Sequence, residues 1–215
     1  MLERYDCAVF DFDGVVLDSN AAKTEAFRKT LAEDPPELVD RLIDYHQYHG
    51  GVSRFVKFEH YYRNIRGGVD IASSMSRALD RFSAFSLRAL MECDEIPGVR
   101  RILDRLVETN IPCFVVSGGA QDEVRKVVAA RGLERYFHRV LGSPATKLEN
   151  MAKLAAEGLL GSPGVYFGDA RSDMDAATTF NLNFVFVAGR SEWRDGAAVC
   201  AHEGFSVIGD FGDLS

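Results

Sequence analysis

Residues 8–19 of the chain read Ala8-Val9-Phe10-Asp11-Phe12-Asp13-Gly14-Val15-Val16-Leu17-Asp18-Ser19. The apolar run over 8–10 is typical of a buried strand, and two carboxylates one residue apart follow it. In an open parallel sheet, ligands bind beyond the carboxyl ends of the strands. We therefore expect Asp11 and Asp13 to lie where a reacting group binds. A lone Asp-x-Asp pair, by contrast, is most often a solvated loop or a helix cap.

A second apolar run, over residues 113–119, ends in a hydroxyl and two glycines, Ser117-Gly118-Gly119. A helix is predicted to follow over 121–131, because Val124, Val127 and Val128 have helical spacing. A strand, a glycine turn and a helix start together favour a phosphate site, since free backbone amides at a helix N-terminus point at an anion. Taken alone, Ser117 is as readily explained as a helix cap.

Two further apolar runs end in charged residues. The run over 139–147 leads into a helix predicted over 148–157, and the run over 165–173 leads into a short amphipathic helix. The charged residues that these runs deliver to strand ends are Lys147, Asp169 and Asp173.

The order of these residues, an acid pair, a hydroxyl, a lysine and a second acid pair, closely resembles the haloacid dehalogenase-like (HAD) superfamily of phosphotransferases. The resemblance covers nearly the whole chain. The first motif is most similar to the branch of phosphoglycolate phosphatase and β-phosphoglucomutase, which carries a helical cap. The four motifs are Asp11-x-Asp13-Gly14-Val15-Val16-x-Asp18-Ser19, Ser117, Lys147 and Gly168-Asp169-x-x-x-Asp173.

The resemblance implies a magnesium-dependent phosphatase that works through an aspartyl phosphate. Asp11 would be the nucleophile, and Asp13 the general acid and then the general base. Ser117 and the Gly118 amide would hold phosphate oxygens. Lys147 would neutralise the negative charge of the phosphate and of the nucleophile. The implied Mg²⁺ ligands are the side chains of Asp11 and Asp169 and the backbone carbonyl of Asp13, with Asp173 bonding a metal-bound water or Lys147.

Alternation of strands and helices after residue 93 predicts an α/β fold: a doubly wound, Rossmann-like parallel sheet in a three-layer core. Between Leu17 and Cys93 the pattern changes to helical stretches broken by Pro and Gly pairs. We therefore expect residues 1–17 and 93–215 to form the catalytic core. In the family that the chain resembles, an insertion at this position is a small helical cap, so residues 18–92 are expected to form a small all-helical cap inserted after the first strand.

Substrate selection is predicted to lie in the cap at residues 50–57, where glycines adjoin charged side chains. Arg54 is our candidate for substrate binding, because its guanidinium can pair bidentately with a carboxylate or a second phosphate. The alternative is a surface arginine in a weak salt bridge. His46 and His49 show no third metal ligand and are expected at the surface or facing substrate, and Asp18 is expected to cap the first cap helix.

Composition limits the possible partners. The 215 residues are 47% hydrophobic and 27% charged, with a formal net charge of −7 and interspersed signs, which argues against a nucleic-acid surface. No signal-peptide pattern and no apolar run of the ~20 residues that span a bilayer are present, so a cytoplasmic protein without membrane contact is expected. The expected partner is a small phosphorylated metabolite, and the oligomeric state is left open.

Three alternatives remain at this stage. A phosphosugar mutase would use the same Asp11 and Asp13 but protect its aspartyl phosphate from water. A receiver-like signalling domain also places acids, a hydroxyl and a lysine at strand ends, and an idle binding module is a third reading. The substrate itself stays open, because Ser117-Gly118-Gly119 is similar to phosphoserine phosphatases whereas residues 14–19 are similar to the other branch.

Overall fold

The structure is a computed structural model that describes residues 2–68 and 70–214. Within these residues the strands form one parallel sheet in the order β3-β2-β1-β4-β5-β6. The first strand thus lies in the middle of the sheet, between β2 and β4. The strands are β1 (Cys7–Phe10), β2 (Cys113–Ala120), β3 (Phe137–Ser143), β4 (Gly164–Gly168), β5 (Asn183–Val187) and β6 (Ser206–Ile208).

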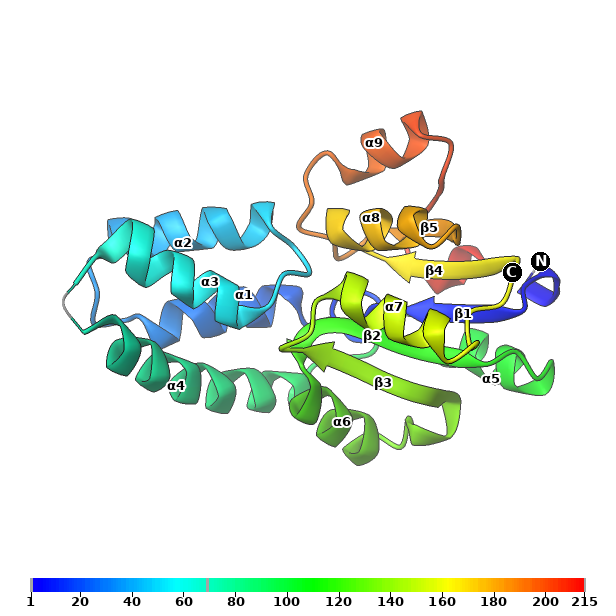
Figure 1. Cartoon of the computed structure of the whole chain (residues 1–215), viewed down its shortest axis with the longest axis horizontal. Helices are drawn as coiled ribbons and strands as arrows, with labels where there is room; N and C mark the ends of the chain where they lie inside the picture. Colours follow the sequence, from blue (N-terminus) through cyan, green and yellow to red (C-terminus); the bar gives the residue numbers. More distant parts are fainter. Residues whose placement is uncertain (1, 69, 215) are drawn as a thin grey trace.

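Helices cover both faces of the sheet (Figure 1). Along β1, Ala8 and Phe10 pack into the core on one face and Cys7 and Val9 into the core on the other, as the two-residue period of a strand requires. The first face carries α5 (Val99–Glu108) and α6 (Gln121–Ala130), and the second carries α7 (Lys147–Ala156), α8 (Arg171–Thr179) and α9 (Gly196–His202). The predicted α/β, Rossmann-like three-layer fold is confirmed.

A group of helices lies beyond the carboxyl ends of the strands (Figure 1). Its members pack around a hydrophobic core of their own, which includes Phe27, Phe58 and Phe82. The chain enters and leaves this group side by side, at the isolated bridge between Leu17 and Glu95. The helices are α1 (Asn20–Thr30), α2 (Pro36–Tyr48), α3 (Arg54–His60), the π-helix η2 (Tyr61–Arg66) and α4 (Ile71–Glu92).

Short 3₁₀ helices complete the described chain at η1 (Leu2–Arg4), η3 (Glu134–Tyr136) and η4 (Phe211–Asp213). None of the helices in residues 2–68 and 70–214 combines the length and the hydropathy needed to cross a bilayer.

The start of α1 differs from the sequence-based expectation. Ser19, not Asp18, occupies the N-cap position of α1, and no side chain caps the helix there. The Asp18 carboxylate instead accepts a hydrogen bond of 2.5 Å from Nε of Arg190, which follows β5. The expectation that Asp18 caps this helix was therefore wrong, because a distant arginine takes its carboxylate.

Candidate active site

Asp11 lies where β1 ends, in the middle of the sheet. Its backbone N–H still donates to the carbonyl of Phe167 at 2.9 Å, so the strand pairing with β4 continues up to this residue. The N–H of Phe12 donates to Asp11 Oδ1 at 2.7 Å and fixes the carboxylate at the turn. The side chain is almost fully buried. Asp11 is therefore a rigidly placed carboxylate at the position where ligands bind in such sheets.

Lys147 reaches Asp11 from the first turn of α7. A capping box starts this helix: Thr146 Oγ1 accepts from the N–H of Glu149 at 3.2 Å, and Glu149 accepts from the N–H of Thr146 at 2.7 Å. Lys147 Nζ lies 3.0 Å from Asp11 Oδ2 and also pairs with Asp173. Burial lowers the pKa of Lys147, but the two carboxylates outweigh burial and raise that pKa, so the ammonium stays charged.

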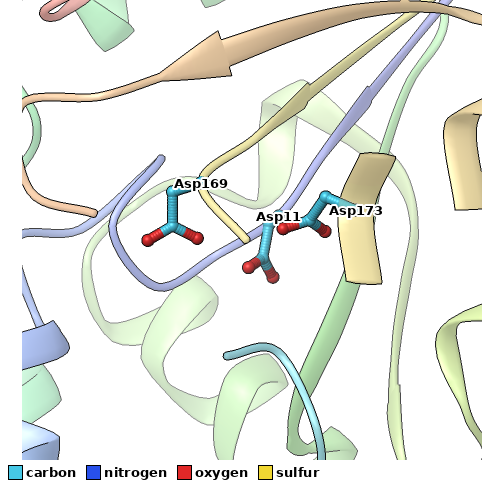
Figure 2. A group of neighbouring side chains, drawn as sticks. All are labelled: Asp11, Asp169 and Asp173. Atoms are coloured by element: carbon cyan, nitrogen blue, oxygen red, sulfur yellow. The ribbon is translucent and has the colours of Figure 1, made fainter. Parts of the chain in front are cut away.

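Three buried carboxylates lie close together at this edge of the sheet (Figure 2), and Lys147 pairs with two of them. Asp11 follows β1, Asp169 follows β4 and Asp173 lies in the first turn of α8, and each offers an oxygen within 4.8 Å of the other two. Burial and then the charges of Asp11 and Asp173 raise the pKa of Asp169 well above its ordinary value. Burial likewise raises the pKa of Asp11 to about 7, against the opposing effect of Lys147.

This donor set fits a hard divalent cation. Carboxylate oxygens are the ligands that Mg²⁺ prefers, and one lysine supplies less positive charge than three neighbouring carboxylates need. Asp173 is already engaged, because it accepts from the Tyr166 hydroxyl at 2.9 Å and from the N–H of Ala170 at 3.1 Å. Asp11 and Asp169 therefore have more oxygen lone pairs free for a metal than Asp173 has.

Asp13 is held apart from this cluster by residues at the start of the helical region. Lys23 on α1 pairs with Oδ2 of Asp13, and Ser19 Oγ donates to Oδ1 at 2.6 Å. Burial raises the pKa of Asp13, but Lys23 and Ser19 together outweigh burial and hold that pKa below its ordinary value. Asp13 is thus an ionised carboxylate within reach of the cavity above Asp11.

Ser117 and Gly118 lie in the last four residues of β2, so the strand continues through the predicted glycine turn and α6 begins directly after it. Ser117 is fully buried, and its Oγ accepts from the N–H of Gly119 at 2.9 Å. Ser117 does not cap α6, whose N-cap residue is Ala120. At Gly118 an added Cβ would lie 2.1 Å from the carbonyl oxygen of Gly51, so glycine is required for the loop between α2 and α3 to rest on the end of β2.

A cavity of about 70 Å³ separates the strand ends from the helical region. Arg54, predicted as a substrate contact, lines it and is buried. Its guanidinium, however, forms a bidentate pair with Glu123 on α6, at 2.6 and 2.7 Å, and donates to Ser83 at 3.1 Å. The alternative of an exposed surface arginine was wrong, and the predicted role in substrate binding stays a prediction.

Several cavity residues were missed by the sequence analysis. Asn20 donates to Asp169 Oδ2 at 2.6 Å and to the carbonyl of Arg190 at 2.9 Å. Lys23 could have been found, because it lies one helical turn from Ser19 and shares its face. The segment after β5, which contains Glu192 and Trp193, has no sequence pattern that predicts a place in the cavity. The missed residues that line the cavity are Asn20, Lys23, Phe27, Phe82, Glu192 and Trp193.

Comparison with known proteins places these motifs in a family. The family model described as "Haloacid dehalogenase-like hydrolase" matches residues 8–187. No curated protein sequence matches the chain.

Solved structures share the whole architecture. A predicted phosphoglycolate phosphatase from Haemophilus somnus has 16% identity and a TM-score of 0.78, covering 98% of this chain and 96% of its own. A β-phosphoglucomutase from Clostridium difficile has 18% identity and a TM-score of 0.73, with 98% and 93% covered. A hydrolase from Pseudomonas syringae has 21% identity and a TM-score of 0.74, with 97% and 95% covered. At these identities the likeness shows the fold.

Proposed function

The chain belongs to the haloacid dehalogenase-like hydrolase family, and from its site we propose that it is a magnesium-dependent phosphatase of a small phosphorylated metabolite. The observation that carries the proposal is the placement of Asp11. This carboxylate lies at the end of the central strand, next to the Lys147 ammonium and within one cluster with Asp169 and Asp173. A candidate nucleophile, a buried ammonium and candidate metal ligands thus lie together at one edge of the sheet, which supports the proposal.

Asp11 would attack the phosphorus atom and form an aspartyl phosphate, which divides one difficult displacement into two easier ones. Lys147 would hold non-bridging oxygens together with Ser117 and the N–H of Gly118. Asp11, Asp169 and the carbonyl of Asp13 would hold Mg²⁺, which when bound supplies charge that neutralises the phosphoryl oxygens. Asp173 would orient Lys147, since it already pairs with that ammonium.

Asp13 would protonate the leaving alcohol and then accept a proton from the water that hydrolyses the aspartyl phosphate. In the present arrangement it is ionised and paired with Lys23. For Asp13 to donate a proton, the Lys23 ammonium must move away or turn to the substrate. We further propose that residues 18–92 form a cap over a core of residues 1–17 and 93–215, so that the cap controls access to this acid.

A phosphosugar mutase would use the same Asp11, Asp13 and Lys147, and it remains the second candidate. The fold shared with a β-phosphoglucomutase is compatible with it. A mutase must also bind a second phosphate, and in this arrangement the guanidinium of Arg54 is neutralised by Glu123. This pairing favours the phosphatase. A receiver domain is disfavoured, because the matching family is one of hydrolases.

The test is phosphate release from a panel of phosphorylated metabolites and an aryl phosphate, with Mg²⁺ and with excess chelator. Steady release that requires Mg²⁺ supports the phosphatase. An isomerised product without release supports the mutase. The proposal is wrong if the folded protein releases phosphate equally well in chelator, or releases none from any ester.

A further inference from the structure

Four cationic side chains are buried around the cavity, and they differ in their partners. Lys23 pairs with Asp13, Arg54 with Glu123, and Lys147 with Asp11 and Asp173. Lys57, on α3, is 3% exposed, yet within residues 2–68 and 70–214 no carboxylate oxygen lies within 4.0 Å of its Nζ. A buried ammonium without a counter-ion is costly, so this one requires an explanation.

Hydrogen bonds hold Lys57 in place through neutral groups. Its Nζ lies 2.6 Å from His46 Nδ1 and donates to the His46 carbonyl at 3.4 Å. His46 Nε2 lies 3.0 Å from Thr24 Oγ1, and Thr24 in turn donates to Glu192 at 2.8 Å. Because the Thr24 hydroxyl donates to a carboxylate, it accepts from Nε2–H of His46, which leaves Nδ1 to accept from Lys57.

These hydrogen bonds fix where the Lys57 ammonium points and how many of its N–H groups are free. Two of its three N–H groups are used by His46, so one remains available at the wall of the cavity that Lys57 lines. The ring of Phe27 lies 6.0 Å from Nζ and offers no hydrogen-bond acceptor. The third N–H of Lys57 therefore finds no hydrogen-bond acceptor in His46 or Phe27.

Charge around Lys57 also favours an incoming anion. Burial and then the Lys23 ammonium lower the pKa of Lys57 to about 7, while Glu192 and Asp13 act in the opposite direction and Lys147 adds to the lowering. Burial, Lys57 and Lys23 lower the pKa of His46 well below its ordinary value, so the ring is neutral. An anion beside Nζ would restore the full charge of the lysine.

We propose that Lys57 binds a carboxylate on the leaving group of the substrate, so that the enzyme selects phosphomonoesters of small hydroxy acids. The proposal rests on the proposed phosphatase function. A carboxylate brings one negative charge to one free ammonium. A second phosphate would bring up to two charges beside Glu192, while the neighbouring Lys23 and Arg54 are already paired. The small cavity, walled by Phe27 and Phe82, suits a compact leaving group.

The experiment compares esters that differ only in the carboxylate. The pairs are 2-phosphoglycolate against 2-hydroxyethyl phosphate, and 3-phosphoglycerate against glycerol 3-phosphate. The readout is the ratio of kcat/KM within each pair, for the full chain with Mg²⁺. A charge-assisted hydrogen bond to a buried cation predicts a ratio of about tenfold or more for the carboxylate in at least one pair. Lys57→Met should reduce that ratio by about tenfold, mainly through KM of the carboxylate ester.

Controls separate a binding role from a structural one. Lys29→Met removes an exposed lysine of α1 and should leave the ratio and the activity unchanged. Lys57→Gln keeps a polar donor without the charge, serves if Lys57→Met does not fold, and should also lose the preference. If Lys57→Met slows both members of a pair equally, Lys57 only supports the fold and the proposal is wrong.

Calorimetry gives a second readout that does not depend on turnover. Binding of 2-phosphoglycolate to the Asp11→Asn variant is measured at pH 8 in buffers of different ionisation heat. Recharging Lys57 predicts uptake of close to one proton, and Lys57→Met in the same background should take up markedly less. Equal uptake with and without Lys57 would overturn the proposal.

The outcomes distinguish a failure of the proposed role of Lys57 from a failure of the proposed phosphatase activity. If the wild-type chain hydrolyses both members of each pair equally well, the phosphatase stands and the role of Lys57 falls. If no ester is hydrolysed with Mg²⁺, the phosphatase itself falls. Trapping of an aldehyde on Lys57 by borohydride, with no carboxylate preference, would show that the lysine acts as a nucleophile instead.

Discussion

Lys23 on α1 pairs with Asp13, the second carboxylate after β1. The pair links the helical region to the strand end and keeps the proposed general acid ionised. Because Ser19 on the adjacent turn donates to the other oxygen of Asp13, both carboxylate oxygens are occupied. In this arrangement Asp13 therefore lacks the proton that the proposed acid step requires.

Asp11→Asn should abolish turnover, by about 10³-fold or more, because the amide has nearly the same volume but cannot attack phosphorus. The measurement is kcat for an aryl phosphate, with circular dichroism to show that the variant is folded. A loss of only a few-fold in a folded variant would contradict the role of Asp11 as nucleophile.

Asp13→Asn should lower kcat for an alkyl phosphate by about 10²- to 10⁴-fold, because the leaving alcohol needs a proton. The first step on an aryl phosphate, which has a good leaving group, should suffer much less. Rapid-quench measurement of the phosphoenzyme separates this step from its hydrolysis. Equal losses in the first step for both esters would show that Asp13 does not act as the acid.

Removal of Mg²⁺ by chelation should stop turnover, and Asp169→Asn should raise the Mg²⁺ concentration for half-maximal rate by about tenfold or more. The matched control is Asp175→Asn, an exposed acid on α8 next to the site. Activity is titrated against Mg²⁺ for the three proteins. If Asp169→Asn and Asp175→Asn behave alike, Asp169 is not a metal ligand.

In chelator, the free energy of unfolding of the wild type relative to that of Asp169→Asn should fall as the pH rises from about 4 to 7. Burial and neighbouring charges raise the pKa of Asp11 from 3.8 to about 7 and that of Asp169 well above 3.8, so across this range these two carboxyl groups bind more protons in the folded state than in the unfolded state. Burial lowers the pKa values of His46 and Lys57, which act in the opposite direction and are present in both proteins. The free energy of unfolding from urea titrations at several pH values measures the slope. Asp169→Asn removes one of the two raised carboxyl groups and keeps His46 and Lys57, so the difference between the two proteins isolates Asp169. A difference that rises with pH would contradict the crowding of these acids.

The Arg54–Glu123 pair should behave as a structural unit. Its side chains are 4% and 13% exposed, so removing either partner leaves a buried charge, and Glu123→Ala should cost about 3 kcal/mol of stability. The double variant Arg54→Ala/Glu123→Ala should cost less than the sum of the single variants. A role of Arg54 in substrate binding additionally requires KM to rise in Arg54→Ala beyond any rise in Glu123→Ala.

Much of the site could be predicted because a parallel sheet brings its strand ends together. Asp11, Ser117 and Asp169 each follow an apolar run, and Lys147 starts the helix after another, so their meeting follows from the topology alone. The same argument correctly predicted the α/β fold from the alternation of strands and helices.

The rest of the site depends on how distant segments pack. Glu192 joins the site because its loop reaches Thr24 and Gln47, at 2.8 and 3.3 Å. Arg54 takes Glu123 as its partner across 69 positions of sequence. No local pattern specifies such pairs, because they depend on the packing of α1, α2 and α3 over the sheet.

In the proposed phosphatase, the contact between Gly51 and Gly118 would shield the reaction at the side of the site. A methyl group at Gly118 would meet the Gly51 carbonyl at 2.1 Å and hold the loop between α2 and α3 away from the end of β2. Bulk water would then reach an aspartyl phosphate at Asp11 from the side as well as from above. In the proposed mechanism, the close approach of these two glycines would thus influence how the phosphoryl group is partitioned between solvent and a bound alcohol.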